Sequence, residues 1–328
     1  MKTPVIPVFF AIDDRFAPCL SVAIQSLVEN ASEAYLYHIV VLHQQLGEVH
    51  RRRLAALADG KTRIEFVEMR QRFEGISPHR MGDNLRPDCF TLTIYFRLFI
   101  ADMFPEYDRG IYIDSDICVP GDISRLYCQP LGNCLIGACP DYSIFDIPPF
   151  VNYTQKAIGV DVHRYINSGV LLLNLKRLRE VGLGSRFLEL LNKWHFDSVA
   201  PDQDYLNALC KDQIRYLDEE WDAMPSDNRP ALAHPSLVHY NRFAKPWIQE
   251  DVQYGDLFWR YARKSAYYAD LLALKEGYSQ EQRERDRHNI ELMVARSVAI
   301  AQLPDNMHQV FDTGRDYRLR PVSALEYA

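Results

Sequence analysis

The sequence predicts an α/β protein built around a mostly parallel sheet. Short runs rich in Val, Ile and Tyr alternate with segments of helical spacing along most of the chain. Several of these runs end in Asp, Asn or Ser, and ligands bind beyond the carboxyl ends of strands in open α/β sheets. We therefore expect βαβ units whose strand ends carry the functional residues.

The expected elements follow from spacing and from their stop signals. The apolar run at 5–12 is a buried strand that Asp13-Asp14 ends, and Gly60 closes an amphipathic helix. The strands expected in order are 5–12, 35–43, 63–69, a strand that begins near Gly110 and ends in Asp114-Ser115-Asp116, 135–138 and 170–175. The expected helices are 20–30, 46–58, 91–103, 184–196 and 202–212. Residues 142–159, which contain Pro148-Pro149, are expected to form a long loop.

The composition changes after about residue 250. Aromatic and cationic side chains are interleaved there, and a polar helix is expected over 280–301. We therefore predict a catalytic domain over 1–250 and a helical extension over 251–328. The extension either binds a membrane surface peripherally, as mixed aromatic and cationic segments do, or packs against the domain as an ordinary helix.

Charge and composition exclude some classes of protein. The 328 residues carry a net charge of −7, which gives no support to nucleic acid as the main partner. The seven cysteines form no C-x-x-C pair, which favours the cytoplasm. No apolar run approaches the roughly 20 residues that span a bilayer, and residues 1–12 are expected to be a first strand rather than a signal peptide.

The most informative stretch is Asp114-Ser115-Asp116, at the end of an apolar run. Residues two apart on a strand point the same way, so the carboxylates of Asp114 and Asp116 can meet at one point. Paired hard oxygens suit a divalent cation that phosphate oxygens complete, which suggests an enzyme handling a nucleotide diphosphate. Alternatively, the triplet only opens a turn.

Further candidates have structural alternatives. His239 could bind Mn²⁺, and Lys245 could pair with phosphate, although an isolated histidine is often structural. Arg97 could hold a carboxylate or phosphate, or form a surface ion pair. Asp202 could be a helix N-cap, which leaves Gln203 to face a pocket.

Two further polar groups belong to the later strands. Asp141 follows the strand at 135–138, whereas Asn167-Ser168-Gly169 precedes the strand at 170–175. The second group reaches the same edge of the sheet only if its strand runs antiparallel.

These motifs, in this order, resemble glycosyltransferase family 8 over about residues 5–247. The resemblance implies the GT-A nucleotide-diphospho-sugar transferase fold, a Rossmann-like mixed and mostly parallel sheet flanked by helices. It also implies that Ala11 to Phe16 form the opening donor motif, with Asp13 binding uracil and Phe16 stacking on it.

The resemblance assigns the remaining residues as well. Arg97 would lie beside the carboxylates of the DxD motif, in which Asp114 and Asp116 bind the metal and Ser115 belongs to the donor site. Asp141 would contact the donor sugar, and Asn167 and Gly169 match a donor-binding segment. Asp202 and Gln203 match a catalytic Asp-Gln-Asp motif, with Gln203 nearest the anomeric carbon.

The last motif of the family contains a histidine that binds the metal and a lysine, here His239 and Lys245. Its glycine is replaced by Arg242, although glycine allows the backbone to approach the diphosphate. Arg242 could block the donor, turn outward or add a second cation.

The implied reaction transfers galactose or glucose from a UDP-sugar to an acceptor hydroxyl with retention, using Mn²⁺ or Mg²⁺. The acceptor would be a saccharide or a lipid-linked saccharide of bacterial lipopolysaccharide or surface polysaccharide. The enzyme would then act in the cytoplasm or at the inner face of the plasma membrane.

No carboxylate offers itself as a nucleophile, so we expect front-face attack in which the leaving phosphate takes the acceptor's proton. The alternative favoured by Arg242 is a degenerate member that binds a sugar nucleotide or glycan without turnover. A nucleotidyltransferase would need a Gly-rich phosphate loop after the first strand, and Asp13 to Phe16 provide none.

Overall fold

A computed structural model describes residues 3–69, 92–242 and 244–319 of the chain. The chain divides into two compact units, each assembled from separated segments. The first unit takes in the described parts of 1–74, 110–130 and 217–287, and the second takes in those of 75–109, 131–216 and 288–328. The division of the chain at residue 250 stays a prediction.

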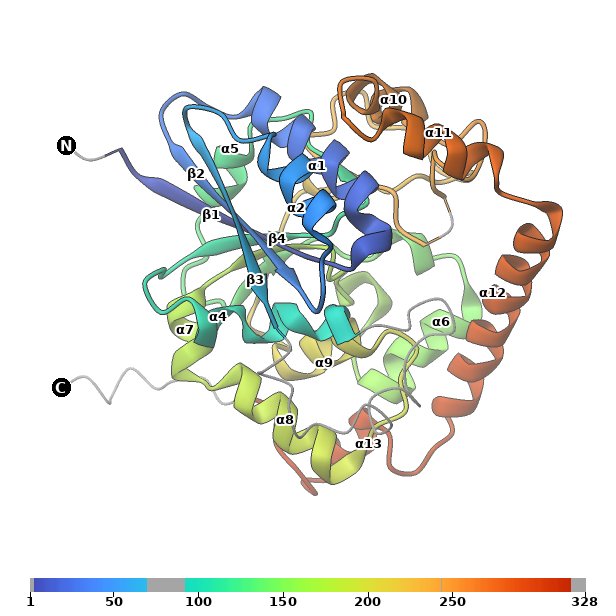
Figure 1. Ribbon diagram of the computed structural model, residues 1–328. Helices are drawn as coiled ribbons and strands as arrows, with labels where there is room; N and C mark the ends of the chain where they lie inside the picture. The colour runs from blue at the N-terminus through green and yellow to red at the C-terminus, as the bar shows by residue number, and fades with distance from the viewer. Residues whose placement is uncertain (1–2, 70–91, 243, 320–328) are drawn as a thin grey trace. The chain divides into compact units, whose positions relative to one another are not determined.

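The first unit contains four parallel strands in the order β3-β2-β1-β4 (Figure 1). Their bounds are β1 Val5–Ile12, β2 Leu36–His43, β3 Thr62–Glu68 and β4 Gly110–Ile113. The central strand β1 is almost wholly buried, which is why it reads as a continuous apolar run. A separate pair of short strands, β5 Ile117–Cys118 and β9 Val238–His239, runs antiparallel.

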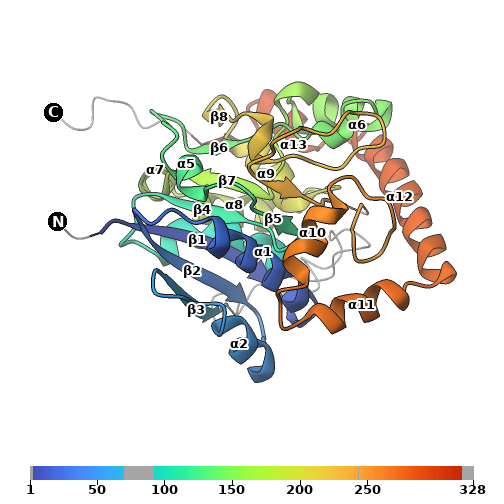
Figure 2. The ribbon, with the colours of Figure 1, turned by 90° about the horizontal axis from the view of Figure 1, so that it is seen from above.

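Helices α10 and α11 pack against α1 in the first unit (Figure 2). The helices of this unit are α1 Ala17–Asn30, α2 Glu48–Ala55, α5 Ile123–Tyr127, α10 Gly255–Ala262 and α11 Tyr268–Glu276. The aromatic residues of the C-terminal region therefore enter the core, where Phe258, Tyr261 and Leu271 are fully buried beside Val22.

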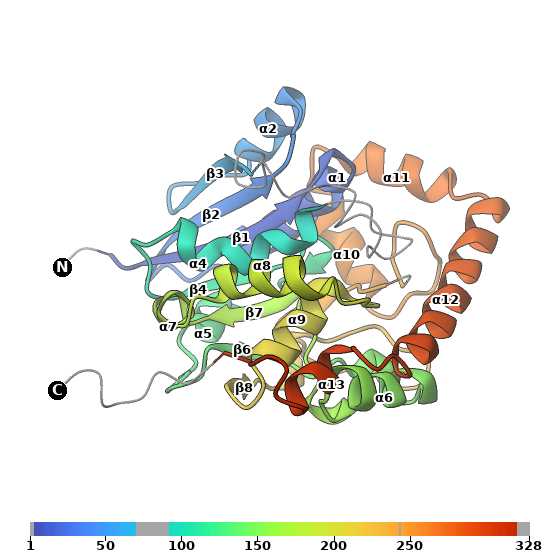
Figure 3. The same cartoon turned by 90° about the horizontal axis from the view of Figure 1, so that it is seen from below.

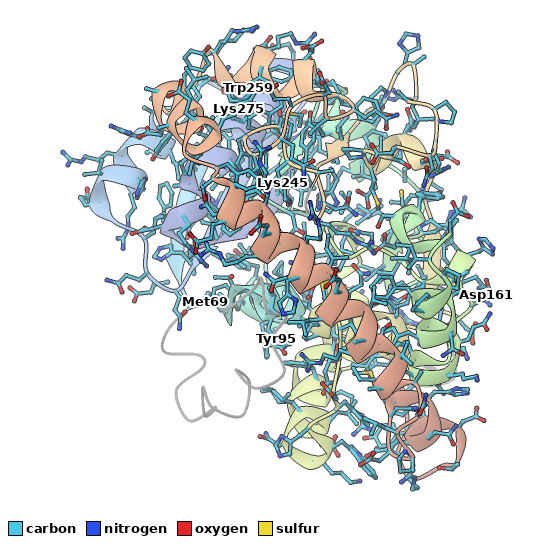
Figure 4. The ribbon with its side chains drawn as sticks, turned by 90° about the vertical axis from the view of Figure 1, so that its right-hand side faces the viewer. Met69, Tyr95, Asp161, Lys245, Trp259 and Lys275 are labelled. Carbon is cyan, nitrogen blue, oxygen red and sulfur yellow. The ribbon has the colours of Figure 1, made fainter. Side chains whose placement is uncertain are left out.

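Two half-buried side chains of α10 and α11 also contact one another. The ammonium of Lys275 lies 5.6 Å from the centre of the Trp259 ring. Both residues are labelled in Figure 4. Packing inside the first unit thus accounts for much of the aromatic and cationic pattern, and membrane association is not supported. Among the helices of the described ranges, none combines the length and apolar character needed to cross a bilayer.

The second unit contains strands in the order β7-β6-β8. Strand β7, Val170–Leu173, runs antiparallel to β6, Ile136–Ala138, whereas β8, Ile214–Tyr216, runs parallel to β6. The helices, drawn in Figure 3, are α4 Ile100–Met103, α6 Pro148–Tyr153, α7 Leu175–Glu180, α8 Leu183–Trp194, α9 Pro201–Leu209 and α13 Met307–Asp312. The fold class expected from the sequence, mostly parallel strands flanked by helices with a helical C-terminal region, is confirmed.

The structure refines several expected elements. The polar helix near the C-terminus is α12, Gln280–Ile300. The helix expected at 91–103 is a 3-10 helix over Leu92–Phe99 that continues as α4, and residue 91 lies outside the described ranges. The long loop expected at 142–159 was wrong, because Pro148 and Pro149 begin α6 at positions where a missing N–H costs nothing.

Candidate active site

The first unit gathers two carboxylates and one histidine into the acidic cluster, which we define as Asp114, Asp116 and His239. Asp114 and Asp116 follow β4, and β5 begins directly after them. Residue Ile117 of β5 pairs with His239 of β9, and the Tyr240 N–H donates to the Asp116 carbonyl over 2.9 Å. The two-stranded sheet thus brings together residues that are more than a hundred positions apart.

The geometry of the acidic cluster fits a divalent cation. His239 Nε2 lies 3.4 Å from Asp116 Oδ1 and 3.9 Å from Asp114 Oδ2. The three potential ligand atoms lie within 4.8 Å of one another. Within the described ranges, Asp116 Oδ1 is buried and accepts no hydrogen bond, an arrangement that a bound cation would satisfy. Two carboxylates with an imidazole suit Mn²⁺ better than Mg²⁺.

Two neighbouring residues, which the sequence reasoning missed, hold the cluster in place. The Tyr112 hydroxyl donates to Asp114 Oδ1 over 2.6 Å, and Asp222 Oδ1 lies 3.0 Å from His239 Nδ1. Tyr112 is the residue two before Asp114, so strand alternation could have found it. Asp222 stands in an aperiodic segment and gave no signal.

Charge around the cluster shifts its pKa values. Burial raises the pKa of Asp116, but the ammonium of Lys245 and the imidazole of His239 outweigh it and hold that pKa well below its usual range. Burial lowers the pKa of His239, yet the carboxylates of Asp116 and Asp222 overcome it and raise the pKa to about 10. Both pKa shifts arise from the attraction between these carboxylates and the cationic side chains beside them.

Lys245 and Arg242 lie in the segment that follows β9. The Lys245 ammonium donates to Asp116 Oδ2 and to the Tyr240 carbonyl. Arg242 is half-buried and has φ of +53°, in the left-handed region that favours glycine. The backbone at this position therefore keeps a glycine-like conformation although the residue is arginine.

The opening motif lies where β1 ends. The Asp13 carboxylate accepts the Arg15 backbone N–H at 3.0 Å and pairs with its guanidinium at 2.8 Å, which caps the 3-10 turn Asp14–Phe16. The side chain of Phe16 is 38% exposed and Ala11 is half-buried. An exposed ring at a strand end is consistent with base stacking, which stays a prediction.

The second unit contains a buried polar network, which we define as Arg97, Asp141, Asn167, Ser168, Asp202 and Gln203. Asp141 Oδ2 accepts from Gln203 Nε2 at 3.0 Å and from Asn167 Nδ2 at 3.3 Å. The antiparallel direction of β7 makes this possible, because the start of β7 lies beside the end of β6. Strand β7 therefore runs in the direction that is needed to bring Asn167 to the same edge of the sheet as Asp141.

Ser168 lies at the centre of the network. Its backbone N–H donates to Gln203 Oε1 at 3.0 Å, and its hydroxyl donates to Asp202 Oδ2 at 2.8 Å. Its carbonyl accepts from the Arg97 guanidinium, which also lies 3.2 Å from Asp202 Oδ2. The sequence placed Ser168 in the candidate group Asn167-Ser168-Gly169 but assigned it no role of its own.

The N-cap explanation of Asp202 is wrong. Helix α9 begins at Pro201, its N-cap is Ala200, and Asp202 lies within the first turn. The carboxylate faces Arg97 and Ser168 instead of capping the helix. The Arg97 ion pair is buried as well, so its interpretation as a surface pair is also wrong.

Gly169 and Ser115 are the remaining residues that the sequence predicted for the site. The Gly169 N–H donates to Asn167 Oδ1 over 2.8 Å, which turns the backbone into β7. Ser115 is buried between the two carboxylates of the DxD motif. The predicted roles of all these residues toward a donor stay predictions.

Comparisons with known proteins agree with this geometry. The sequence profile described as glycosyl transferase family 8 matches residues 7–251. A "Putative glycosyltransferase" of Haemophilus influenzae is 24% identical over 221 residues, which cover 67% of this chain and 64% of that protein. The "Lipopolysaccharide 1,2-glucosyltransferase" of Escherichia coli is 28% identical over 167 residues, which cover 47% and 48%. This chain thus spans less than two thirds of either relative.

Solved structures show the same fold. A galactosyltransferase, LgtC, in complex with donor and acceptor sugar analogues matches with a TM-score of 0.66 and 26% identity, over 80% of this chain and 96% of that chain. The apo structure of the bifunctional glycosyltransferase WbbM matches with a TM-score of 0.70, over 84% of this chain and 52% of that chain. Its 23% identity supports the fold alone.

Proposed function

Because this chain belongs to glycosyltransferase family 8, we propose that it transfers galactose or glucose from a UDP-sugar to a saccharide hydroxyl, with retention. The observation that carries the proposal is the acidic cluster of Asp114, Asp116 and His239, whose potential ligand atoms lie within 4.8 Å of one another. A divalent cation held there would supply the positive charge that stabilises a departing diphosphate. The lipopolysaccharide glucosyltransferase among the relatives supports surface polysaccharide as the setting.

The basic residues near the cluster would bind the rest of the diphosphate. The Lys245 ammonium, now on Asp116, lies close enough to the cluster to pair with a phosphate oxygen. Arg242 would add a second cation if its guanidinium turns toward the donor. Phe16 would stack on uracil and Asp13 would accept from it.

The residues of the buried polar network would position the donor sugar. Asp141 and Gln203 are held rigidly, because each already bonds to a second member of the network. Rigid polar groups lose little entropy when they orient a substrate. Asp202 would keep Arg97 and Ser168 in place.

Front-face attack remains the mechanism that the chemistry favours. A double displacement needs a carboxylate that can reach the anomeric carbon. Asp204, next to Gln203, is fully buried, and its oxygens accept from Tyr153, Tyr165 and Ser198. Asp204 is therefore poorly suited to attack the anomeric carbon. In a front-face reaction the acceptor hydroxyl attacks that carbon directly, and its proton passes to the departing phosphate.

The proposal is tested by measuring UDP release from UDP-galactose and UDP-glucose, with Mn²⁺ and then with EDTA. We expect slow metal-dependent hydrolysis of one donor, reduced at least about 100-fold in Asp116→Ala, because a metal ligand is lost. The matched control is Asp122→Ala, which removes a carboxylate that caps α5 in the same unit. Equal rates with Mn²⁺ and EDTA would contradict the metal-dependent reaction.

A second candidate function is favoured by Arg242 alone. A protein that binds a sugar nucleotide without turnover would bind UDP in calorimetry yet release none from any donor. The same preparation therefore separates the two functions. Absence of both binding and release would contradict both.

A further inference from the structure

We propose that Asp222 is a positioning residue of the acidic cluster: its carboxylate holds the His239 imidazole so that Nε2 faces a divalent cation. The inference rests on the proposed function, because it assigns a role toward the cation that this function requires.

The two nitrogens of His239 face different groups. Nδ1 lies 3.0 Å from Asp222 Oδ1, whereas Nε2 lies 3.4 Å from Asp116 Oδ1 and 3.9 Å from Asp114 Oδ2. An ionised carboxylate can only accept hydrogen bonds, so the contact requires the proton to be on Nδ1. In the neutral ring this leaves the lone pair on Nε2, the nitrogen that faces the other two carboxylates.

Burial strengthens the contact between Asp222 and His239. Asp222 is 0% exposed and His239 is 3% exposed, so little water competes for either group. A buried carboxylate is costly unless it is held in a hydrogen bond with a donor. The pairing between Asp222 and His239 is therefore unlike a surface ion pair, which side-chain motion and solvent would weaken.

The backbone presets this pairing. Ala223, the residue after Asp222, accepts the His239 N–H over 2.9 Å and donates its own N–H to the Leu237 carbonyl over 3.0 Å. These bonds attach the Asp222 segment to strand β9, next to the histidine. On the other side of Asp222, Trp221 is buried and ends a 3-10 turn, Glu219–Trp221. Asp222 therefore has little freedom to leave His239.

A purely structural role makes a different prediction. If Asp222 only stabilises the fold, its loss lowers the free energy of unfolding and leaves cation affinity unchanged in the folded protein. If it orients the ligand, its loss weakens cation binding about 10- to 100-fold, as for other residues that hydrogen-bond to metal ligands. Direct measurement of cation affinity separates these roles.

The experiment measures Mn²⁺ binding to the full chain by electron paramagnetic resonance of free Mn²⁺, without donor or turnover. The variants are Asp222→Leu, which has a similar size but accepts no hydrogen bond, and Asp222→Asn, whose amide oxygen can still accept from Nδ1–H. Thermal unfolding of each variant confirms that it is folded. The matched controls are Asp122→Leu and Asp122→Asn, the same changes at the carboxylate that caps α5.

We expect Asp222→Leu to weaken Mn²⁺ binding about 10- to 100-fold. Asp222→Asn should retain clearly more affinity than Asp222→Leu, because its amide oxygen can still accept from Nδ1–H. The two Asp122 variants should bind Mn²⁺ like the native protein. A folded Asp222→Leu variant with native Mn²⁺ affinity would overturn the inference. If Asp222→Leu does not fold, Asp222→Ala takes its place. A roughly tenfold loss of Mn²⁺ affinity in Asp222→Ala, with native affinity in the Asp122 variants, would support the inference, and native affinity in Asp222→Ala would overturn it. A native protein that binds no Mn²⁺ would overturn the proposed function instead, and this inference with it.

Discussion

Arg242 combines the chemistry of arginine with the backbone of glycine. Its φ of +53° costs a residue with a Cβ roughly 1 kcal/mol relative to glycine. Such a conformation persists when the surrounding structure fixes the chain, and here β9 and Lys245 flank the position on either side. Arg242 thus departs from the family motif, which has glycine at this position, and it also has a backbone conformation that favours glycine.

We predict that Arg242→Gly is more stable than Arg242→Ala by about 1 kcal/mol. Both changes remove the guanidinium, so the difference between them isolates the cost of the Cβ at positive φ. Urea unfolding of the two variants measures it. Equal stability of the glycine and alanine variants would contradict a left-handed backbone at this position.

The residues of the acidic cluster could be proposed from the sequence because they stand in short, recognisable motifs. Asp114 and Asp116 stand two apart at the end of an apolar run, and His239 begins a recognisable motif. The roles of Asp222 and Ser168 could not be found in this way, since their partners lie far from them in the sequence. A single aspartate or serine has many structural uses, and only the fold selects one.

Elements were predicted best where periodicity was strong. The apolar runs became β1 and β7, both buried, because parallel and internal strands are covered on both faces. The prediction of a loop over 142–159 failed because Pro148 and Pro149 were taken to interrupt regular structure, whereas they begin α6. The N-cap explanation of Asp202 failed for a related reason, since helix α9 begins one residue earlier, at Pro201.

The segment after α13 is fastened to helix α8 through Asp316. Its carboxylate accepts from Trp194 Nε1 at 2.7 Å and Lys193 Nζ at 2.9 Å, and it pairs with the Arg186 guanidinium. The Arg186 guanidinium carbon also lies 3.8 Å from the ring centre of Tyr317. Burial raises the pKa of Asp316, but these donors outweigh it and hold that pKa well below its usual range.

We predict that the contribution of Asp316 to stability is lost at acid pH. A carboxyl whose pKa is depressed by folding stabilises the folded state fully above its unfolded pKa, near 3.9, and progressively less below it. Asp316→Asn should therefore lose about 2 kcal/mol at pH 7, with a smaller difference from the native protein below pH 4. Urea unfolding across this range measures the difference, and Asp312→Asn, on an exposed side chain of α13, is the control. A difference that does not shrink with falling pH would contradict the assignment.

At the scale of the whole molecule, the chain alternates between its two units. Each unit is assembled from segments that lie far apart in the sequence, and the family match ends at residue 251. Composition along the chain could therefore indicate where the character of the sequence changes, but it could not show which segments share a core. The first unit illustrates this, since its core joins Val22 of α1 to Phe258 and Leu271.

A protein truncated after residue 250 tests whether the family-matched region folds alone. It would lack Phe258, Tyr261 and Leu271, each fully buried in the core of the first unit. Removing one large buried side chain costs about 2–5 kcal/mol, and a whole domain is stable by only about 5–15 kcal/mol. We therefore predict that residues 1–250 alone are unfolded or aggregated, as judged by near-ultraviolet circular dichroism and size-exclusion chromatography.

Single substitutions in the full chain give the matched comparison. Phe258→Ala should fold but unfold at lower urea, because it loses only one of the three core contacts and leaves the other helical residues in place. Leu274→Ala, on an exposed position of α11, should unfold like the native protein. A truncated protein with cooperative unfolding and native Mn²⁺ affinity would show instead that the C-terminal helices only cover a domain that is stable without them.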